Sequence, residues 1–473
     1  MSDAKYPKSA SRDTRWVEGL RGMAAVFVMT SHLALSYADF LEAARSKNQP
    51  PRWYNMPFIR VIFEGSPWVS VFLVLTGFVN ALKPIKQTRA GHVDAALSDL
   101  ASSCFRRSLR LMLPCTIATF LAWILAETGG FQTGRMVMSH WLVTTCAKPS
   151  GGLWLAIGTL FRAIMDTWSW NNNEIERNQW AMLYFLKGAM AVYVFLLATL
   201  KTRATYRMYL AAGLVAYGWR GLDAYIFMPI FTGVLLAEAS QTATVHAFMS
   251  SRSIPLRILP YMALLFGWYC MSFPNRFPNR MPWSDNMLNF ALNSFPENSD
   301  IHAYYNQIGV TFVIMAITFS QSLQRFFNLR LFQWLGARSF PIYLVHGPVL
   351  RSFLNWVLFA GEKVQWVEEV DKEGKVLGLV PMFGIPPGAK FLWALPLFLV
   401  ATLVLADLWY RHVEPPCAQA TKWIEERMRS NVIQSARTEK PSTPELSLSE
   451  AHFGSPLSRA TTPMNEVDFV LPR

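Results

Sequence analysis

The sequence predicts an all-α, polytopic membrane protein with about ten transmembrane helices and both termini in the cytosol. Hydrophobic residues make up 52% of the 473 residues, and charged residues only 16%, against roughly 25% in soluble domains. Apolar runs of about 20 residues, the length that crosses a bilayer, recur along the chain. Lys and Arg cluster beside alternate ends of these runs, which indicates the cytosolic side.

Ten apolar runs are candidate spans. They are Trp16–Leu35, Phe58–Leu82, Leu109–Ala126, Trp180–Leu200, Met208–Trp219, Ala224–Ala239, Ile254–Phe273, Ile308–Leu323, Phe340–Ala360 and Leu392–Tyr410. The fifth and sixth are short and only Arg-Gly-Leu-Asp separates them, so they could form a tight hairpin or one re-entrant unit. We interpret Leu153–Met165, which Arg162 interrupts, as an interfacial segment.

The formal net charge of +13 is interpreted as a topology signal. With the N-terminus in the cytosol, the cytosolic side holds most of the basic residues near span ends, among them Lys5, Lys8, Arg12, Arg15, Lys83, Lys86, Arg89, Arg106, Arg107, Lys201, Arg203, Arg252, Arg325, Arg330 and Arg338. An even number of spans returns the C-terminus to the same side. No nucleic-acid partner is expected, because binding would need a basic stripe on a soluble face.

The chain is expected to have three parts: a cytosolic segment 1–15, a transmembrane domain 16–415 and a cytosolic region 416–473. Within the last, Ala418–Met428 could be a short amphipathic helix on the membrane surface. From Ser430 the chain is rich in Ser, Thr, Pro and Glu, cannot bury a core and is expected to be disordered. The five cysteines form no Cys-x-x-Cys pair, so neither a zinc site nor a redox framework is expected.

Ionisable residues inside a span are functional candidates, because charge is costly in lipid. Glu18, Arg21 and His32 lie on one stripe of the first span, since eleven residues make three helical turns plus about 20°. The rise from Arg21 to His32 is about 16 Å, which places Arg21 near the cytosolic mouth and His32 deep inside. Gly19 and Gly22 leave room for another backbone. The alternative is an interfacial Glu18–Arg21 pair and a histidine that only packs.

Three further clusters have both a functional and a structural interpretation. Arg107 and Arg110, with Arg106, open the third span at the cytosolic side, where paired guanidinium groups suit phosphate, although plain membrane anchoring explains them equally well. Ser339, Tyr343 and His346 are spaced four and three residues apart and share a helix face, although alone Tyr343 could be an interfacial aromatic and His346 a packed histidine. Thr76, Gly77 and Asn80 interrupt the second span, either for helix packing or to line a ligand cavity.

Four motifs in order resemble the acyltransferase 3 family, and details resemble its fungal branch. Gly19–Gly22 with His32 matches the first, Gly65 through Phe78 the second, Arg107 with Arg110 the third, and Leu335 through Pro348 the fourth. The closing Arg411-x-x-Glu414-Pro415 is also similar to the end of the family's domain.

The resemblance implies a ten-helix membrane enzyme that moves an acyl group, usually acetyl, from coenzyme A to a hydroxyl. It implies His32 as the catalytic base, and it associates Arg21, Arg107 and Arg110 with the acyl donor and the active-site entrance. We count Arg21 and Glu18, on the same stripe as His32, among the candidate catalytic residues. Ser339, Tyr343 and His346 are expected at the substrate or around the site. Acyl-coenzyme A is then a co-substrate, no metal is needed, and no Ser or Cys nucleophile is required if the hydroxyl attacks directly. The expected partners are a small-molecule alcohol, such as a fungal terpenoid or polyketide, and the lipid bilayer, with the endoplasmic reticulum or another internal membrane as location.

One position departs from the family pattern. Relatives often carry Leu-Trp-Thr-x-Pro-x-Glu-Phe-x-Gly-Ser at the fourth span, where this chain has Phe185 in place of the glutamate. The departure could suit a more hydrophobic acceptor or could weaken catalysis. A transporter that uses the same polar interior, or a catalytically silent relative, is the alternative function.

Overall fold

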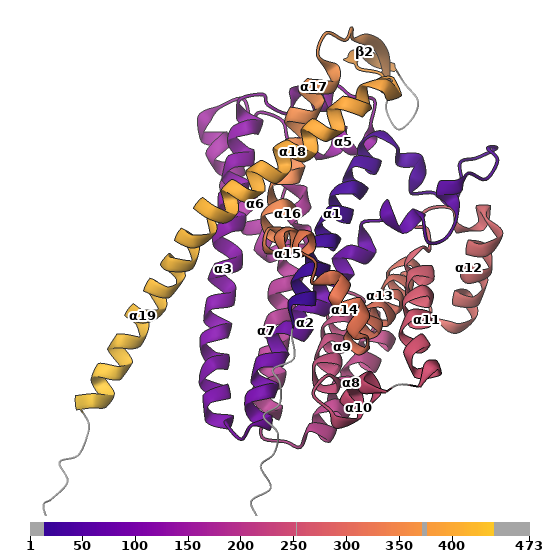
Figure 1. The fold of residues 1–473 in the computed structure, drawn as a ribbon. Coiled ribbons are helices and arrows are strands. Elements are labelled where there is room, and N and C mark those ends of the chain that lie inside the picture. The colour runs from indigo at the N-terminus through magenta and orange to yellow at the C-terminus, as the bar shows by residue number, and fades with distance from the viewer. Residues whose placement is uncertain (1–13, 252, 371–375, 439–473) are drawn as a thin grey trace, which may run out of the picture. The chain divides into compact units, whose positions relative to one another are not determined.

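The computed structural model describes residues 14–251, 253–370 and 376–438, and nearly all secondary structure in them is helical (Figure 1). The chain forms two compact units, Met1–Glu425 and Glu426–Arg473, and the site described below lies in the first. The N-terminal Lys5, Lys8 and Arg12, Arg252, and the tail from residue 439 lie outside the described residues, so the predictions for them stay predictions.

The α-helices occur in the following order. They are α1 (Arg15–Tyr37), α2 (Ser66–Arg89), α3 (Val93–Glu127), α4 (Gln132–Arg135), α5 (His140–Thr145), α6 (Leu153–Trp170), α7 (Met182–Thr199), α8 (Ala204–Arg220), α9 (Phe227–Ala239), α10 (Ala243–Ser250), α11 (Ile254–Met271), α12 (Pro282–Ser294), α13 (Ile301–Phe319), α14 (Gln321–Phe327), α15 (Arg330–Ala337), α16 (Ser339–Val349), α17 (Asn355–Phe359), α18 (Gly388–His412) and α19 (Glu414–Thr438).

Short helical turns complete the helical part. Five are 3-10 turns, η1 (Asp39–Leu41), η2 (Trp53–Asn55), η3 (Arg60–Ile62), η4 (Arg177–Ala181) and η5 (Pro278–Arg280), and η6 (Leu350–Leu354) is a π-helical segment between α16 and α17.

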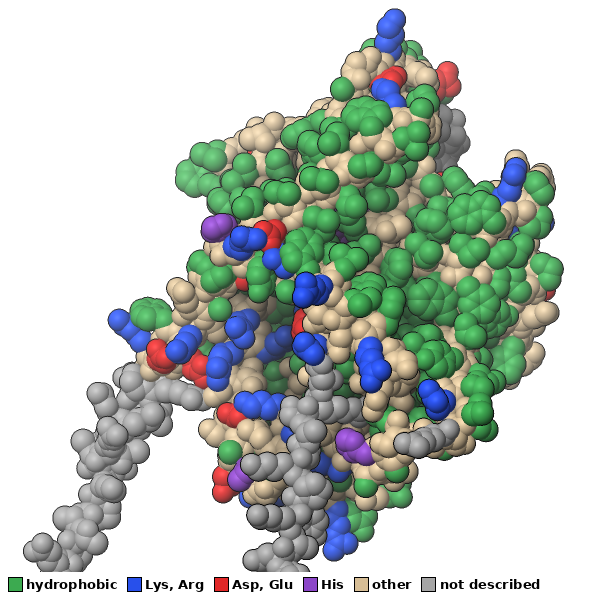
Figure 2. All heavy atoms as spheres, in the orientation of Figure 1, with side chains coloured by type: hydrophobic (Ala, Val, Ile, Leu, Met, Phe, Trp, Pro, Cys, Tyr) green, Lys and Arg blue, Asp and Glu red, His purple; other side chains and the backbone are tan. Residues whose placement is uncertain are grey.

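The structure confirms the membrane character of the chain. Among the described residues, six helices are long and apolar enough to cross a bilayer, namely Ser66–Arg89, Val93–Glu127, Arg177–Thr199, Ile254–Met271, Ser339–Phe359 and Gly388–Met428. A seventh is counted if the bent pair Ile301–Phe319 and Gln321–Phe327 forms one span. Figure 2 shows hydrophobic side chains over much of one face, with Lys and Arg gathered toward its lower part. The number ten and the cytosolic termini stay predictions.

Each of the ten predicted runs overlaps a helix, but several boundaries were wrong. The second helix begins at Ser66 and not at Phe58, because Pro67 in its first turn fixes the start after Gly65. The third begins sixteen residues earlier than predicted, at Val93. The eighth ends at Phe319, and the chain turns by 101° into α14.

Four other segments differ in kind or extent from the prediction. The fifth and sixth runs are two separate helices, α8 and α9, and not a re-entrant unit. The predicted interfacial segment is part of α6, and the predicted helix Ala418–Met428 is part of the longer α19.

The all-α prediction missed one antiparallel hairpin of β1 (Gln365–Val370) and β2 (Val376–Met382), in which Gln365 lies opposite Met382. Runs rich in Val, Trp and Leu on both sides of Asp371–Lys375 were its sequence signal.

Glycines let pairs of helices approach until their backbones touch. A Cβ at Gly22 of α1 would lie 2.5 Å from the backbone nitrogen of Gly336 in α15, and one at Gly336 would lie 2.1 Å from the carbonyl oxygen of Glu18. This confirms the predicted role of Gly22. In the same way, Gly77 of α2 meets the backbone of α9 at Ile230. Such small-residue contacts are typical of membrane helices, where packing replaces the hydrophobic drive.

Helix α16 lies in the interior of the first unit. It packs against α1, α3, α15 and α18, and most of its residues are buried (Figure 1). The crossing of α1 with α15 therefore also holds α1 beside α16, although the two helices are some three hundred residues apart in sequence.

Substitution Gly22→Ala should destabilise the protein by about 1–3 kcal/mol, because the new Cβ meets backbone atoms that cannot swing aside. Thermal unfolding in detergent should show a lower midpoint. Gly213→Ala on α8 is the control, since a Cβ there meets nothing within 4 Å. Equal midpoints for both variants would contradict the importance of this crossing.

Candidate active site

One cavity of about 680 Å³ gathers most of the predicted site residues. That volume falls within the range of about 300–1,000 Å³ usual for small-molecule sites. Helices α1, α2, α3, α7, α15, α16, α18 and α19 contribute its lining: Glu18, Arg21, Phe72, Leu75, Thr76, Val79, Asn80, Arg107, Arg110, Leu111, Pro114, Met182, Phe185, Gly336, Ala337, Ser339, Phe340, Tyr343, Tyr410, Arg411, Glu414, Pro415, Cys417 and Ala418.

One part of the cavity gathers Arg21, Arg107 and Arg110 together with the carboxylates of Glu18 and Glu414. Arg21 donates to the Glu18 carboxylate at 3.1 Å, so the i,i+3 pair forms as the alternative interpretation expected, but both side chains also line the cavity. Arg107 joins them with a buried Nε that has no hydrogen-bond partner among the described residues. Arg110 lies nearby and is exposed. An unpartnered guanidinium nitrogen beside other arginines fits an anionic ligand.

Two neighbouring arginines are engaged elsewhere. Arg106 forms an ion pair with Glu425 at 3.0 Å and does not line the cavity. Arg411 lines the cavity but pairs with Asp407 at 2.7 Å. The structure thus separates Arg107 and Arg110 from Arg106, which the sequence pattern could not do.

The opposite wall of the cavity is apolar. Phe185 is 8% exposed, and its ring packs edge-on against Phe72 at 6.3 Å between centroids. Leu75, Val79 and Met182 extend this wall. Position 185 therefore faces the cavity and not lipid, so the departure from the family motif changes the cavity wall.

Both interpretations of the second span hold, for different residues. Gly77 packs against α9, whereas Thr76 and Asn80 line the cavity. Asn80 accepts a hydrogen bond from the hydroxyl of Tyr193 at 2.9 Å, which fixes its orientation in the cavity wall.

Helix α16 leads from the cavity into the interior. Ser339 and Tyr343 line the cavity, and the buried Ser339 hydroxyl has no partner among the described residues. The Tyr343 hydroxyl donates to the carbonyl oxygen of Asn178. One turn further, His346 is fully buried, and its ring lies 5.9 Å from that of Tyr343.

His346 pairs with His32 across the α1–α16 contact. His32 Nδ1 lies 2.8 Å from His346 Nε2, and the rings stack at 5.0 Å between centroids. His32 does not itself line the cavity, but α16 connects the two places. Arg21 and His32 thus lie on one stripe of α1, where Arg21 lines the cavity and His32 forms the histidine pair.

The hydrogen bonds assign the protons of the neutral pair. His346 Nδ1 lies 2.9 Å from the carbonyl oxygen of Ile342, which can only accept, so this nitrogen carries a proton. His346 Nε2 is then an acceptor, and His32 Nδ1 donates to it. The remaining nitrogen, His32 Nε2, is left with a free lone pair. The pair therefore presents one basic nitrogen.

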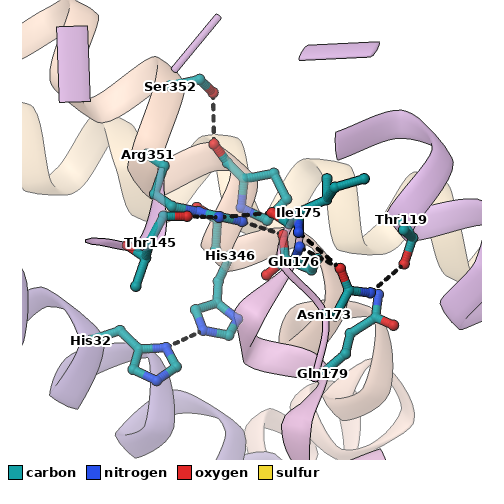
Figure 3. Close-up of polar contacts among 12 residues, drawn as sticks. His32, Thr119, Thr145, Asn173, Ile175, Glu176, Gln179, His346, Arg351 and Ser352 are labelled. Carbon is teal, nitrogen blue, oxygen red and sulfur yellow. Dashed lines mark hydrogen bonds and ion pairs between the residues drawn. The ribbon is translucent and has the colours of Figure 1, made fainter. Parts of the chain in front are cut away.

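Sequence reasoning missed a buried ion pair beside these histidines. Arg351 in η6 and Glu176 before η4 pair with side-chain exposures of 2% and 1% (Figure 3). Arg351 stands inside the predicted ninth span, so the rule for charges in membranes could have found it. Glu176 lies in a polar loop without such a signal.

No group of three or more metal-ligating side chains was found in the described part of the chain. The assembled groups are a cationic patch, an apolar wall and a basic imidazole connected to them by α16. That set suits an anionic co-substrate and proton removal from a second, less polar substrate.

Comparisons with known proteins show what the chain is similar to. A family model described as an acyltransferase domain matches residues 14–411. The chain is 22% identical to O-acetyltransferase PaAT-1 of Phomopsis amygdali, over 88% of this chain and 85% of the relative. It is also 22% identical to acyltransferase clz18 of Cochliobolus lunatus, over 85% and 94%. An acyltransferase of a Phoma species is likewise 22% identical, over 89% and 97%. No solved structure matches the chain.

Proposed function

We propose a reaction for this chain, which belongs to the acyltransferase 3 family and is a membrane acyltransferase. It moves an acetyl or related acyl group from acyl-coenzyme A to the hydroxyl of a small hydrophobic molecule. One observation carries the proposal. Ser339 and Tyr343 of α16 line the cavity that collects Arg21, Arg107 and Arg110, and one turn further along α16 lies His346, whose pairing with His32 leaves His32 Nε2 unprotonated.

The cationic part of the cavity is the proposed site of the acyl donor. The nucleotide end of coenzyme A is highly anionic, and guanidinium groups bind phosphate through charge-assisted hydrogen bonds. Arg107 fits this role because its buried Nε lacks a partner. The unpartnered Ser339 hydroxyl is available to the less charged parts of the donor.

His32 is the proposed general base. Its Nε2 takes the proton of the acceptor hydroxyl while that oxygen attacks the thioester carbonyl. The bond from carbonyl carbon to sulfur then breaks, and the proton passes to the departing thiolate, which gives the ester and free coenzyme A. His346 holds His32 in the tautomer this step needs. No covalent acyl-enzyme is required.

The acceptor is proposed to be a hydrophobic alcohol of the terpenoid or polyketide kind. The apolar wall of Phe72, Val79 and Phe185 supports this, because it offers little hydrogen bonding to a polyhydroxylated substrate. The printed name of PaAT-1, an O-acetyltransferase, supports an acetyl group and an oxygen acceptor. An internal membrane such as the endoplasmic reticulum is the proposed location.

His32→Ala should lower kcat by about 10²–10⁴-fold, the usual contribution of a general base, without changing expression or membrane insertion. Turnover of acyl-coenzyme A by the purified protein measures it. His246→Ala is the control, because His246 is exposed on α10 and outside the cavity. A near wild-type rate in the His32 variant would refute the assignment.

Replacing Arg107 and Arg110 together with Gln should raise the donor KM and weaken coenzyme A binding, since each lost contact is worth about 1.5–3 kcal/mol. Arg106→Gln is the matched control, because this adjacent arginine pairs with Glu425 outside the cavity. Unchanged donor affinity in the double variant, with reduced insertion or abundance, would show that the arginines only anchor the helix.

Phe185→Glu tests the acceptor class, because it returns a carboxylate to the apolar wall. Turnover of a hydrophobic alcohol should fall relative to that of a polyhydroxylated one, while Phe185→Met, which keeps the wall apolar, should preserve the ratio. A large gain on both acceptors would show instead that the native protein is catalytically impaired.

A further inference from the structure

The buried pair of Arg351 and Glu176 has no part in the chemistry assigned so far. Both charges lie in the interior, where an ion pair gains little stability over apolar packing and where removal of one partner leaves a costly unpaired charge. Figure 3 shows the pair on the side of His346 away from His32. Its position next to the basic histidine pair calls for a functional explanation.

Arg351 connects three segments of the chain through its guanidinium group. Nη1 donates to the carbonyl oxygens of Thr145 at 2.7 Å and Ile175 at 3.0 Å, and Nε donates to that of Gly347 at 3.2 Å. Nη2 bonds the Glu176 carboxylate. The residue can reach all of them because it lies in the π-helical segment η6, and such segments often occur at functional sites.

Hydrogen bonds also hold Glu176 in place. Its backbone N–H donates to Oδ1 of Asn173 at 2.7 Å, and Asn173 in turn donates to Thr119 and Thr167 at 3.0 and 2.9 Å. One carboxylate oxygen bonds Arg351, the other, Oε1, is buried, and the backbone N–H of Asn178 also stabilises the carboxylate. Glu176 is thus held in place by Arg351, Asn173 and Asn178.

Gly347 brings this carboxylate close to the histidines. A Cβ at Gly347 would lie 2.0 Å from Asn178 Nδ2 and 2.8 Å from Glu176 Oε1, so the Asn178 amide and the Glu176 carboxylate both lie against the residue directly after His346. Of the other ionisable groups around α16, Glu18, Arg21, Arg107 and Arg110 line the cavity and Asp407 pairs with Arg338. The Cys146 thiol lies near Arg351 and Glu176, and Tyr343 lies near Glu176 and Cys115 of α3.

We propose that Arg351 and Glu176 are positioning residues for His32, acting through His346: together they fix the Gly347 segment of α16, and Glu176 supplies the counter-charge when the histidine pair takes up a proton. The proposal rests on the proposed role of His32 as base. Taking the hydroxyl proton makes the histidine pair cationic, and an uncompensated Arg351 would oppose that charge. Glu176, which is ion-paired with Arg351, offsets the charge of Arg351.

Glu176→Gln is the informative substitution, because it keeps the shape and removes the charge. The chain offers a control in Glu238, a second buried carboxylate with 0% exposure, which pairs with Arg207 and Arg89 away from the cavity. Glu238→Gln inflicts the same kind of loss on the fold. A purely structural role predicts similar effects of both variants on thermal unfolding and activity.

Glu176→Gln should lower kcat by about tenfold or more and move the acidic limb of the pH–rate profile about one unit toward lower pH, since a less compensated Arg351 disfavours the protonated pair. The donor KM should not change. Glu238→Gln should leave the profile in place. A Glu176→Gln profile identical to the wild type, or loss of activity only in proportion to lost folded protein in both variants, would overturn the proposal.

Histidine ¹⁵N resonances provide a readout that does not need turnover. In wild-type protein His32 should carry its proton on Nδ1, and this signature should be lost in His346→Leu and kept in His346→Gln, whose amide oxygen can accept. The histidine pair should titrate at lower pH in Glu176→Gln than in wild type. If the titration differs in this way between wild type and Glu176→Gln but the wild-type protein transfers no acyl group, the proposed function fails alone. Acyl transfer by the wild type without this difference overturns this inference alone.

Discussion

The close approach of α1 to α15 and α16 is the constraint on which the rest of the structure depends. Gly22 and Gly336 remove the side chains that would separate the helices, so backbone meets backbone. That contact puts Glu18 and Arg21 into the cavity wall and, about three turns later on α1, brings His32 against His346. A single helix crossing thereby positions both the proposed donor site and the proposed base.

The interior shows how a membrane protein keeps polar chemistry in an apolar surrounding. The polar atoms around the histidines are bonded in sequence: Ile342 accepts from His346, His346 accepts from His32, and Tyr343 donates to Asn178. Among the buried polar atoms without a partner in the described residues, Arg107 Nε and the Ser339 hydroxyl belong to residues that line the cavity. These two groups are available to a bound substrate.

Helical spacing predicted which residues share a face of one helix, but it did not predict contacts between segments that are far apart in the chain. The spacing of Glu18, Arg21 and His32 fixed their shared face, and the spacing of Ser339, Tyr343 and His346 did the same for α16. The pairing of His32 with His346 could not be read from either pattern alone, because it depends on how two helices cross. Glu176 could not be found at all, because its role follows from Arg351, 175 residues away.

The amino-acid sequence by itself determined that the chain is a helical membrane protein, because apolar length and periodicity are local properties. It also determined which residues of α1 and α16 face inward, and its ordered motifs pointed to the family. Tertiary structure decided which of the neighbouring arginines line the cavity, that Phe185 faces it, and which nitrogen of His32 is free. Those outcomes depend on contacts between distant segments, and helical periodicity constrains the face of a residue but not its partner.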